Sequence, residues 1–223
     1  MVNQIFENVK RIKQTIANGN GYGEKITLVA ATKMQTAEAI NLAIQAGVDA
    51  VAENKVQEFR DKTNCLQACP QHFIGHLQTN KVKYLIGKID LYHSCDRDSL
   101  VAEISRLSVK NNLVSNVLIQ VNIGSEESKG GYEYEEAKDV YLRLSQMQGL
   151  KVKGFMAMLP KTDDEEVLIP LIKKMRFLYD WAKTKSADVE YLSMGMSGDY
   201  PLCIAHGSNM IRVGSTIFGH RNY

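Results

Sequence analysis

The chain has 223 residues, of which 44% are hydrophobic and 23% are charged, and its formal net charge is +2. This composition is ordinary for a compact globular domain, and the length suffices for one large core. No block of like charge occurs, so the charge pattern predicts no nucleic-acid partner. The first residues, MVNQIFENVKRIKQ, are amphipathic and mixed in charge, which argues against a signal peptide or a membrane span. We therefore expect one domain over residues 1–223, in the cytoplasm.

Eight short apolar segments alternate with helical patterns along the chain. The segments that we predict as strands are residues 25–33, 49–52, 71–75, 89–93, 115–122, 152–157, 189–193 and 209–213. Helical periodicity occurs at residues 3–17, before the first strand, and at 36–46, 80–86, 99–109, 135–147 and 166–184. This alternation predicts an α/β fold, a parallel sheet closed into a (β/α)8 TIM-type barrel with an extra N-terminal helix. An open, doubly wound sheet is the alternative that the same alternation permits.

A lysine ends the first predicted strand, and two explanations of this residue, Lys33, remain open. Its ammonium either reaches solvent where the strand stops, or lies partly desolvated at the mouth of the barrel. In the second case the amine is easier to deprotonate and can form a Schiff base with an aldehyde. If the barrel closes, the eighth strand lies beside the first, and Lys33 shares a rim with the segments that follow the last strands.

Small and hydroxyl residues follow the last two predicted strands. Residues 193–198 (SMGMSG) follow the seventh strand, and Gly214, Ser215 and Thr216 follow the eighth. Glycines allow the backbone to approach an anion, while amide N–H groups and hydroxyls donate hydrogen bonds to it. In TIM-type barrels the phosphate site is typically built from the loops after strands seven and eight. The sequence therefore predicts a phosphate site on the rim that carries Lys33.

Two cysteines and two histidines lie close together in the sequence, at Cys65, Cys69, His72 and His76. Their residue types match zinc ligands, but two residues separate the pairs, whereas zinc fingers separate them by about a dozen. A predicted strand also runs through the histidines. We therefore expect no structural zinc here. Without an export signal, free thiols are the simpler interpretation of all four cysteines in the chain.

Several segments resemble, in order, those of the pyridoxal 5′-phosphate (PLP) homeostasis proteins, single-domain relatives of the barrel domain of bacterial alanine racemase. They are LVAATK at 28–33, AENKVQE at 52–58, HFIGHLQTNK at 72–81, HSCD at 93–96, QVNIGSEESKGG at 120–131, GFMAM at 154–158, LSMGMSGD at 192–199 and IRVGSTIFG at 211–219. The resemblance extends from near the start of the chain to its last strand. The family commonly has GENY where this chain has AENK, so the resemblance assigns no role to Lys55.

The resemblance implies that Lys33 carries PLP as a Schiff base. The other cofactor-binding residues that it implies are Ser197, Gly214 and Ser215 at the phosphate, Arg212 at the pyridine nitrogen, and Asn54 and His76 at the nearby rim. The implied function is PLP homeostasis, by buffering or by delivery to PLP-requiring apoenzymes. We expect a monomer with no membrane or nucleic-acid partner.

Two other functions are compatible with these residues, a small PLP-dependent racemase and a module that binds a phosphorylated metabolite without a covalent bond. Racemisation works best with an acid or base on each face of the carbanion, here Lys33 and a tyrosine. The related racemase takes that tyrosine from a second domain and a partner subunit. We expect no second domain here, and no motif selects Tyr132, Tyr200 or Tyr223. An arginine at the pyridine nitrogen can only donate, which makes PLP a poor electron sink. We therefore expect little or no turnover and no catalytic residue.

Overall fold

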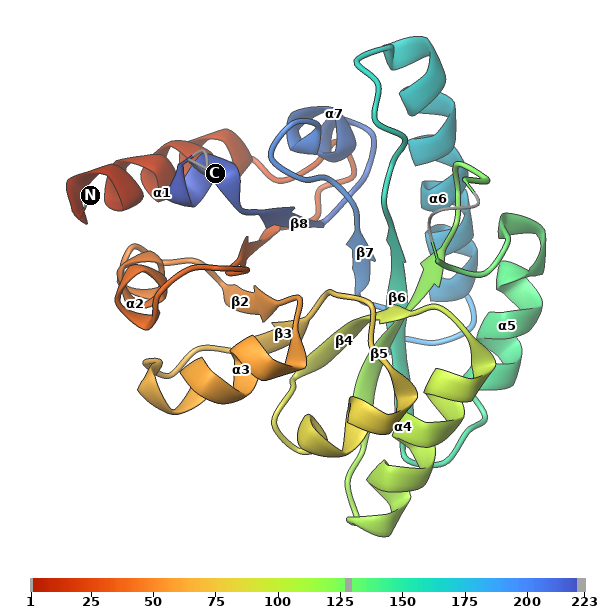
Figure 1. Ribbon diagram of the computed structural model, residues 1–223. Helices are drawn as coiled ribbons and strands as arrows, with labels where there is room; N and C mark the ends of the chain where they lie inside the picture. The colour runs from red at the N-terminus through yellow and green to blue at the C-terminus, as the bar shows by residue number, and fades with distance from the viewer. Residues whose placement is uncertain (1, 127–129, 220–223) are drawn as a thin grey trace.

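The structure is a computed structural model that describes residues 2–126 and 130–219. Eight parallel strands close into a barrel in chain order, with β8 paired to β1 (Figure 1). The strands are β1 (Thr27–Ala31), β2 (Ala50–Glu53), β3 (Gln71–Phe73), β4 (Leu91–Cys95), β5 (Ser115–Val121), β6 (Leu150–Ala157), β7 (Tyr191–Ser193) and β8 (Met210–Val213). The closed order confirms the predicted TIM-type barrel and excludes the open sheet.

Helices surround this barrel (Figure 1). They are α1 (Val2–Ile16), α2 (Ala37–Gln45), α3 (Val56–Lys62), α4 (Asp98–Lys110), α5 (Ala137–Leu144), α6 (Glu165–Lys183), α7 (Tyr200–Ala205) and α8 (Ser215–Phe218). Short 3-10 helices are η1 (Thr63–Cys65), η2 (Thr79–Tyr84) and η3 (Tyr134–Glu136), and η2 replaces the α-helix predicted at residues 80–86. The sequence did not predict α3, α7 and α8, because one or two turns contain too few residues for a periodic pattern.

The extra N-terminal helix is confirmed as α1, and it lies beside the last helix of the described chain (Figure 1). Its buried face consists of isoleucine and valine at helical spacing: Ile5, Val9, Ile12 and Ile16. This face packs in one cluster with Ile217 of α8. Asn8 Nδ2 also donates to the carbonyl of Ile217 at 3.0 Å. An amphipathic stripe thus becomes a helix only because a matching apolar surface covers it.

Apolar side chains fill both sides of the strands. A small cluster inside the barrel contains Val29, Ala50, Ala52, Leu91, Leu118, Met156 and Met210, while larger clusters lie between the strands and the helices. Because side chains alternate along a strand, the residue two positions after an inward one also faces inward. Polar side chains follow this rule: Arg212 lies two residues after Met210, and His93 two residues after Leu91.

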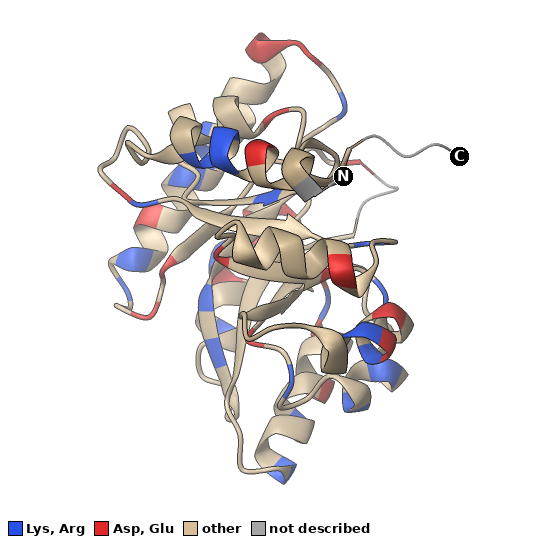
Figure 2. Ribbon diagram, turned by 90° about the vertical axis from the view of Figure 1, so that its left-hand side faces the viewer, with Lys and Arg blue, Asp and Glu red and all other residues tan. Residues whose placement is uncertain are grey.

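Basic and acidic residues are interspersed over the helices and loops of the described chain (Figure 2). None of the helices in residues 2–126 and 130–219 is long and apolar enough to cross a membrane.

Candidate functional site

Lys33 lies in a turn two residues after β1, so the predicted strand, residues 25–33, extended two residues too far at each end. Met34 ends the extended run, because its φ of 61° is a left-handed conformation that strands do not contain. The alternation from Val29 through Ala31 places Lys33 on the inward side of the rim. The lysine is partly exposed, and its ammonium makes no hydrogen bond or ion pair with any residue that the structure describes.

Two carboxylates and a lysine hold this turn in place. Thr32 Oγ1 donates to Glu53 Oε1 at 2.7 Å, and Lys62 Nζ donates to the same oxygen at 2.9 Å. Glu58 accepts from the backbone N–H of Met34 at 2.6 Å and from Lys62 at 2.8 Å. Burial opposes ionisation of Glu58, but the hydrogen bonds from Lys62 and Met34 outweigh it and lower the pKa of this carboxyl. The contacts offset the strain of a left-handed methionine and fix the backbone of the lysine before it.

The loops after β7 and β8 meet at the same rim. Ser197 Oγ accepts from the backbone N–H groups of Gly214 and Thr216, each at 3.3 Å, at the start of α8. Gly214 lies close to β1, since a Cβ there would be 3.3 Å from the carbonyl oxygen of Ala31. Ser215 is exposed beside it. The structure thus brings the predicted phosphate-binding residues together at the end of β1, where Lys33 follows.

Arg212 lies inside the barrel rather than on its rim, and only 4% of it is exposed. Its Nη1 donates to the carbonyl of Ser193 at 2.8 Å and to Ser193 Oγ at 2.7 Å, and its Nη2 donates to the carbonyl of Ala157 at 3.1 Å. Burial lowers the pKa of Arg212 to about 10, so the guanidinium stays protonated at neutral pH. The Nε–H and the second Nη2 hydrogen have no partner among the described residues, which leaves donors for a ligand.

Asn54 and His76 share a hollow of about 250 Å³ with Lys55 and Lys81. Asn54 follows β2 directly, and pairing of Ala31 with Ala52 places it beside Lys33 in the register of the rim. The side chain of His76 is 67% exposed, and its Nδ1 lies 3.1 Å from Asp96 Oδ2. The structure therefore brings these two predicted residues together, although no hydrogen bond or ion pair in the described chain links them to Lys33.

Three polar residues inside the barrel were missed by sequence reasoning as site residues. His93 Nδ1 lies 3.1 Å from Ser193 Oγ, and His93 Nε2 lies 3.0 Å from His72 Nδ1. Burial lowers the pKa of His72 to about 4 and that of His93 well below its ordinary value, so both rings are neutral at pH 7. The sequence pattern that could have identified them is the alternation along a strand: His93 lies two residues after Leu91, which faces the barrel interior.

The four residues with zinc-like identity are separated by the fold. His72 faces the interior, His76 faces solvent, and Cys65 is exposed at the end of η1. The predicted strand through both histidines was wrong, because β3 ends at Phe73. Within the described residues, no group of three His, Cys, Asp or Glu side chains could hold a metal ion.

Of the three tyrosines considered as a second acid or base, Tyr132 uses its hydroxyl elsewhere in the described structure. Tyr132 donates its hydroxyl to Asp98 Oδ1 at 2.7 Å, at the start of α4. Burial and this hydrogen bond raise the pKa of Tyr132. Tyr200 begins α7, and Tyr223 lies outside the described residues.

Comparison with known proteins identifies the family. A family model for the N-terminal domain of alanine racemase matches residues 2–222. The pyridoxal phosphate homeostasis protein of Aquifex aeolicus is 37% identical over 225 residues, which cover 100% of this chain and 97% of that protein. The chain belongs to the pyridoxal phosphate homeostasis protein family. Its Escherichia coli K12 relative of the same name is 34% identical over 232 residues, covering 100% of this chain and 99% of the relative. This confirms the resemblance seen in the sequence.

A solved structure with the same fold contains the cofactor. PipY of Synechococcus elongatus with PLP bound superimposes with a TM-score of 0.83 at 26% identity, covering 97% of this chain and 100% of PipY. The closed barrel described above is therefore shared with a protein whose structure includes PLP.

Proposed function

We propose that this protein binds PLP through a Schiff base on Lys33 and serves intracellular PLP homeostasis, by buffering or delivery, with little or no turnover. The observation that supports this most is the rim itself. A lysine without an ion-pair partner among the described residues follows β1, beside the Gly214 and Ser197 loops and above the free donors of Arg212. The presence of PLP in PipY supports the same ligand.

The residues at this rim fit the three reactive parts of the cofactor. The hydroxyls of Ser197 and Ser215 would donate to the phosphate at the start of α8, which favours an anion, and the backbone N–H of Gly214, which donates to Ser197 Oγ, would hold that hydroxyl in place. The two free donors of Arg212 would face the pyridine nitrogen. When bound, PLP supplies an aldehyde that condenses with a primary amine and a ring that can accept electrons. The fixed turn at Met34 would keep the amine of Lys33 in reach of that aldehyde.

Two features support binding without turnover. Arg212 stays protonated at neutral pH, so it donates to the pyridine nitrogen and leaves that nitrogen unprotonated, which weakens the ring as an electron acceptor. Tyr132, a candidate for a second acid or base, uses its hydroxyl on Asp98 instead. The homeostasis names of the relatives agree with this interpretation.

The proposal includes the whole chain, residues 1–223, as one PLP-binding domain that acts as a monomer in the cytoplasm and delivers PLP to apoenzymes. Delivery is measured by mixing the PLP-loaded protein with an apo-aminotransferase and following recovery of aminotransferase activity. We expect recovery in the presence of a scavenger that removes free PLP. Recovery that the scavenger abolishes would contradict direct delivery.

Borohydride reduction of the PLP-loaded protein followed by peptide mass spectrometry tests the attachment. We expect one reduced adduct, on Lys33, in the wild type and in the matched control Lys55→Arg. Lys33→Arg keeps the charge but cannot form a Schiff base, so it should form no adduct at that rim. A single adduct at the wild-type level in Lys33→Arg would refute the assignment. Alanine racemisation by the wild type at roughly 1–1000 per second would refute the non-enzymatic role.

A further inference from the structure

A continuous line of polar side chains crosses the barrel interior. Arg212 Nη1 lies 2.7 Å from Ser193 Oγ, which lies 3.1 Å from His93 Nδ1, and His93 Nε2 lies 3.0 Å from His72 Nδ1. The four residues come from β8, β7, β4 and β3, and none is more than 7% exposed. Aliphatic residues fill the neighbouring inward positions. Buried polar groups are costly unless every donor finds an acceptor, so this line needs an explanation beyond packing.

Hydrogen-bond chemistry gives the line one direction. A guanidinium only donates, so Ser193 Oγ accepts from Arg212. If Ser193 then donates its hydrogen to His93 Nδ1, each hydrogen that lies between two neighbouring members of the line has an acceptor. If His93 Nδ1 instead donated to Ser193 Oγ, the buried hydroxyl hydrogen of Ser193 would have no acceptor among the described residues, which is unfavourable. His93 must therefore carry its proton on Nε2 and donate it to His72 Nδ1.

The same logic fixes the far end of the line. His72 accepts at Nδ1, so its own proton lies on Nε2. This side chain lines a cavity of about 440 Å³ at the N-terminal mouth of the barrel, together with Asp49 and Asp90. Both rings must be neutral for the line to exist. Burial lowers the pKa of each histidine, and for His93 the neighbouring His72 and Arg212 lower it further, in agreement with this requirement.

We propose that Ser193, His93 and His72 are positioning residues that orient the guanidinium of Arg212 toward the pyridine nitrogen of PLP. This inference rests on the proposed function and deepens the role of Arg212 in it. Without an acceptor at His93, the buried hydroxyl hydrogen of Ser193 has no partner among the described residues, and the hydroxyl is no longer fixed with its oxygen toward the guanidinium. The carbonyls of Ser193 and Ala157 would still accept from Arg212, so the barrel would stay closed. The guanidinium would lose only the orientation that the Ser193 hydroxyl gives it.

The tautomers test the line without any cofactor. Nitrogen-15 NMR of histidine-labelled protein at pH 7 distinguishes a ring protonated at Nδ1, at Nε2 or at both nitrogens. We expect His72 and His93 to be neutral and protonated at Nε2, with signals assigned by their loss in His72→Gln and His93→Asn. A proton on His93 Nδ1, or a charged ring at either position, would overturn the proposal.

A matched pair of variants tests the action on the ring nitrogen. Leu and Asn have nearly the same shape, but only Asn offers an oxygen near the position of His93 Nδ1. The ligands are PLP and its analogue with CH in place of the ring nitrogen. We expect His93→Leu to bind PLP roughly tenfold more weakly and the analogue unchanged, whereas His93→Asn stays within about threefold of wild type for both.

Equal losses of both ligands in His93→Leu would mean a purely structural role and would overturn the proposal, as would unchanged PLP binding. If His93→Leu does not fold, Ser193→Ala is measured with the same ligand pair and the same expectation. A wild type that binds no PLP would refute the proposed function instead, and the histidine tautomers would still decide the direction of the line.

Discussion

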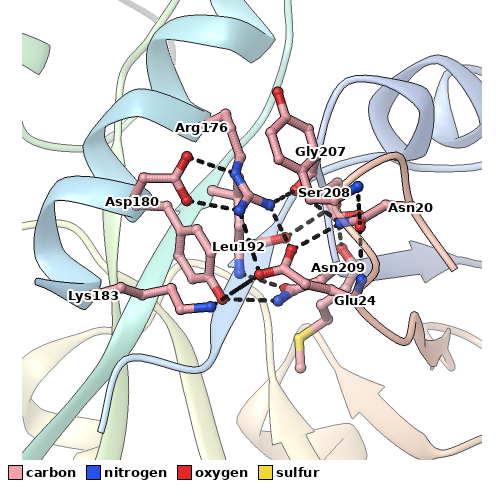
Figure 3. Close-up of polar contacts among 12 residues, drawn as sticks. Asn20, Glu24, Arg176, Asp180, Lys183, Leu192, Gly207, Ser208 and Asn209 are labelled. Atoms are coloured by element: carbon pink, nitrogen blue, oxygen red, sulfur yellow. Dashed lines mark hydrogen bonds and ion pairs between the residues drawn. The ribbon is translucent and has the colours of Figure 1, made fainter. Parts of the chain in front are cut away.

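Arg176 joins three segments that are distant in sequence, and replacing it should be among the more damaging single changes in this protein. From α6 its Nε and Nη2 donate to Asp180 at 3.0 and 2.7 Å, in a bidentate pair (Figure 3). Its Nη1 donates to Glu24, before β1, and to the carbonyl of Gly207, before β8, the latter at 3.0 Å. The guanidinium also lies over the ring of Tyr22, 3.8 Å from its centre.

The magnitude of the effect depends on which partners are buried. Removing one partner of a buried ion pair costs about 3–5 kcal/mol. Here the side chain of Arg176 is 8% exposed, that of Glu24 17% and that of Asp180 46%, so the Asp180 pair contributes little. Glu24 also keeps hydrogen bonds from Asn20 and Lys183. We therefore expect Arg176→Met to lower the free energy of unfolding by about 3 kcal/mol, which for a chain of this length is roughly 6–12 °C in Tm.

Acid should reduce this difference. Burial raises the pKa of Glu24, but hydrogen bonds from Arg176, Asn20 and Lys183 outweigh it, so the pKa is below the ordinary 4.5. A carboxyl with a depressed pKa in the folded state stabilises the fold above its unfolded pKa, and this contribution is lost as the pH falls through the folded value. The wild type should therefore lose more stability than Arg176→Met below about pH 4.5.

Urea unfolding followed by circular dichroism, at pH 7 and at a series of pH values below 4.5, measures both effects. Arg176→Lys is the matched control. It keeps the positive charge but not the planar guanidinium that donates several hydrogen bonds at once, and it should lose about half as much stability as Arg176→Met. A free energy of unfolding of Arg176→Met within about 0.5 kcal/mol of wild type at pH 7 would refute the argument, since surface substitutions have effects of that size. If the difference in unfolding free energy between wild type and Arg176→Met does not shrink in acid, the contribution assigned to the Arg176–Glu24 pair is refuted.

Three further predictions concern the rim and the barrel wall. Ser197→Ala should weaken PLP binding roughly tenfold, because a hydroxyl that can donate to the phosphate is lost, and should leave the binding of pyridoxal unchanged. Titration calorimetry with both ligands checks this, and equal losses of affinity for the two ligands would argue against a phosphate contact. Glu53→Gln should both weaken PLP binding and lower the midpoint of urea unfolding, because the carboxylate that holds the turn of Lys33 is lost. An unchanged affinity for PLP together with an unchanged urea midpoint would contradict that role. Gly154→Ala should destabilise the barrel by at least about 3 kcal/mol, because φ there is +139° and a Cβ would lie 1.9 Å from the carbonyl oxygen of Tyr191. The control Gly198→Ala, where nothing lies within 4 Å of the added carbon, should change Tm little, and similar Tm values for both variants would contradict the steric argument.

Much of the fold could be predicted from the sequence because its causes are local. The apolar segments and helical patterns specify strands and helices one by one, and a parallel sheet of eight strands in sequential order has a natural closure. That closure alone predicts that the loops of Ser197 and Gly214 lie at the end of β1, which Lys33 follows, and the structure places Gly214 beside Ala31 at that end. The amphipathic stripe of α1 was likewise visible at the spacing of a helix.

What the sequence could not determine is set by contacts between distant strands. Ser193 and His93 are 100 residues apart, and no local pattern indicates that their side chains meet inside the barrel. Arg212 was predicted at the pyridine nitrogen, but its protein partners were not: the alternation in β8 turns it into the barrel, where Ser193 and Ala157 accept its hydrogen bonds. The end of β1 was also misplaced, because the left-handed Met34 is held by Glu58. Strand identity follows from local periodicity, but the partner of a buried polar side chain is decided only when the barrel closes and each donor must find an acceptor.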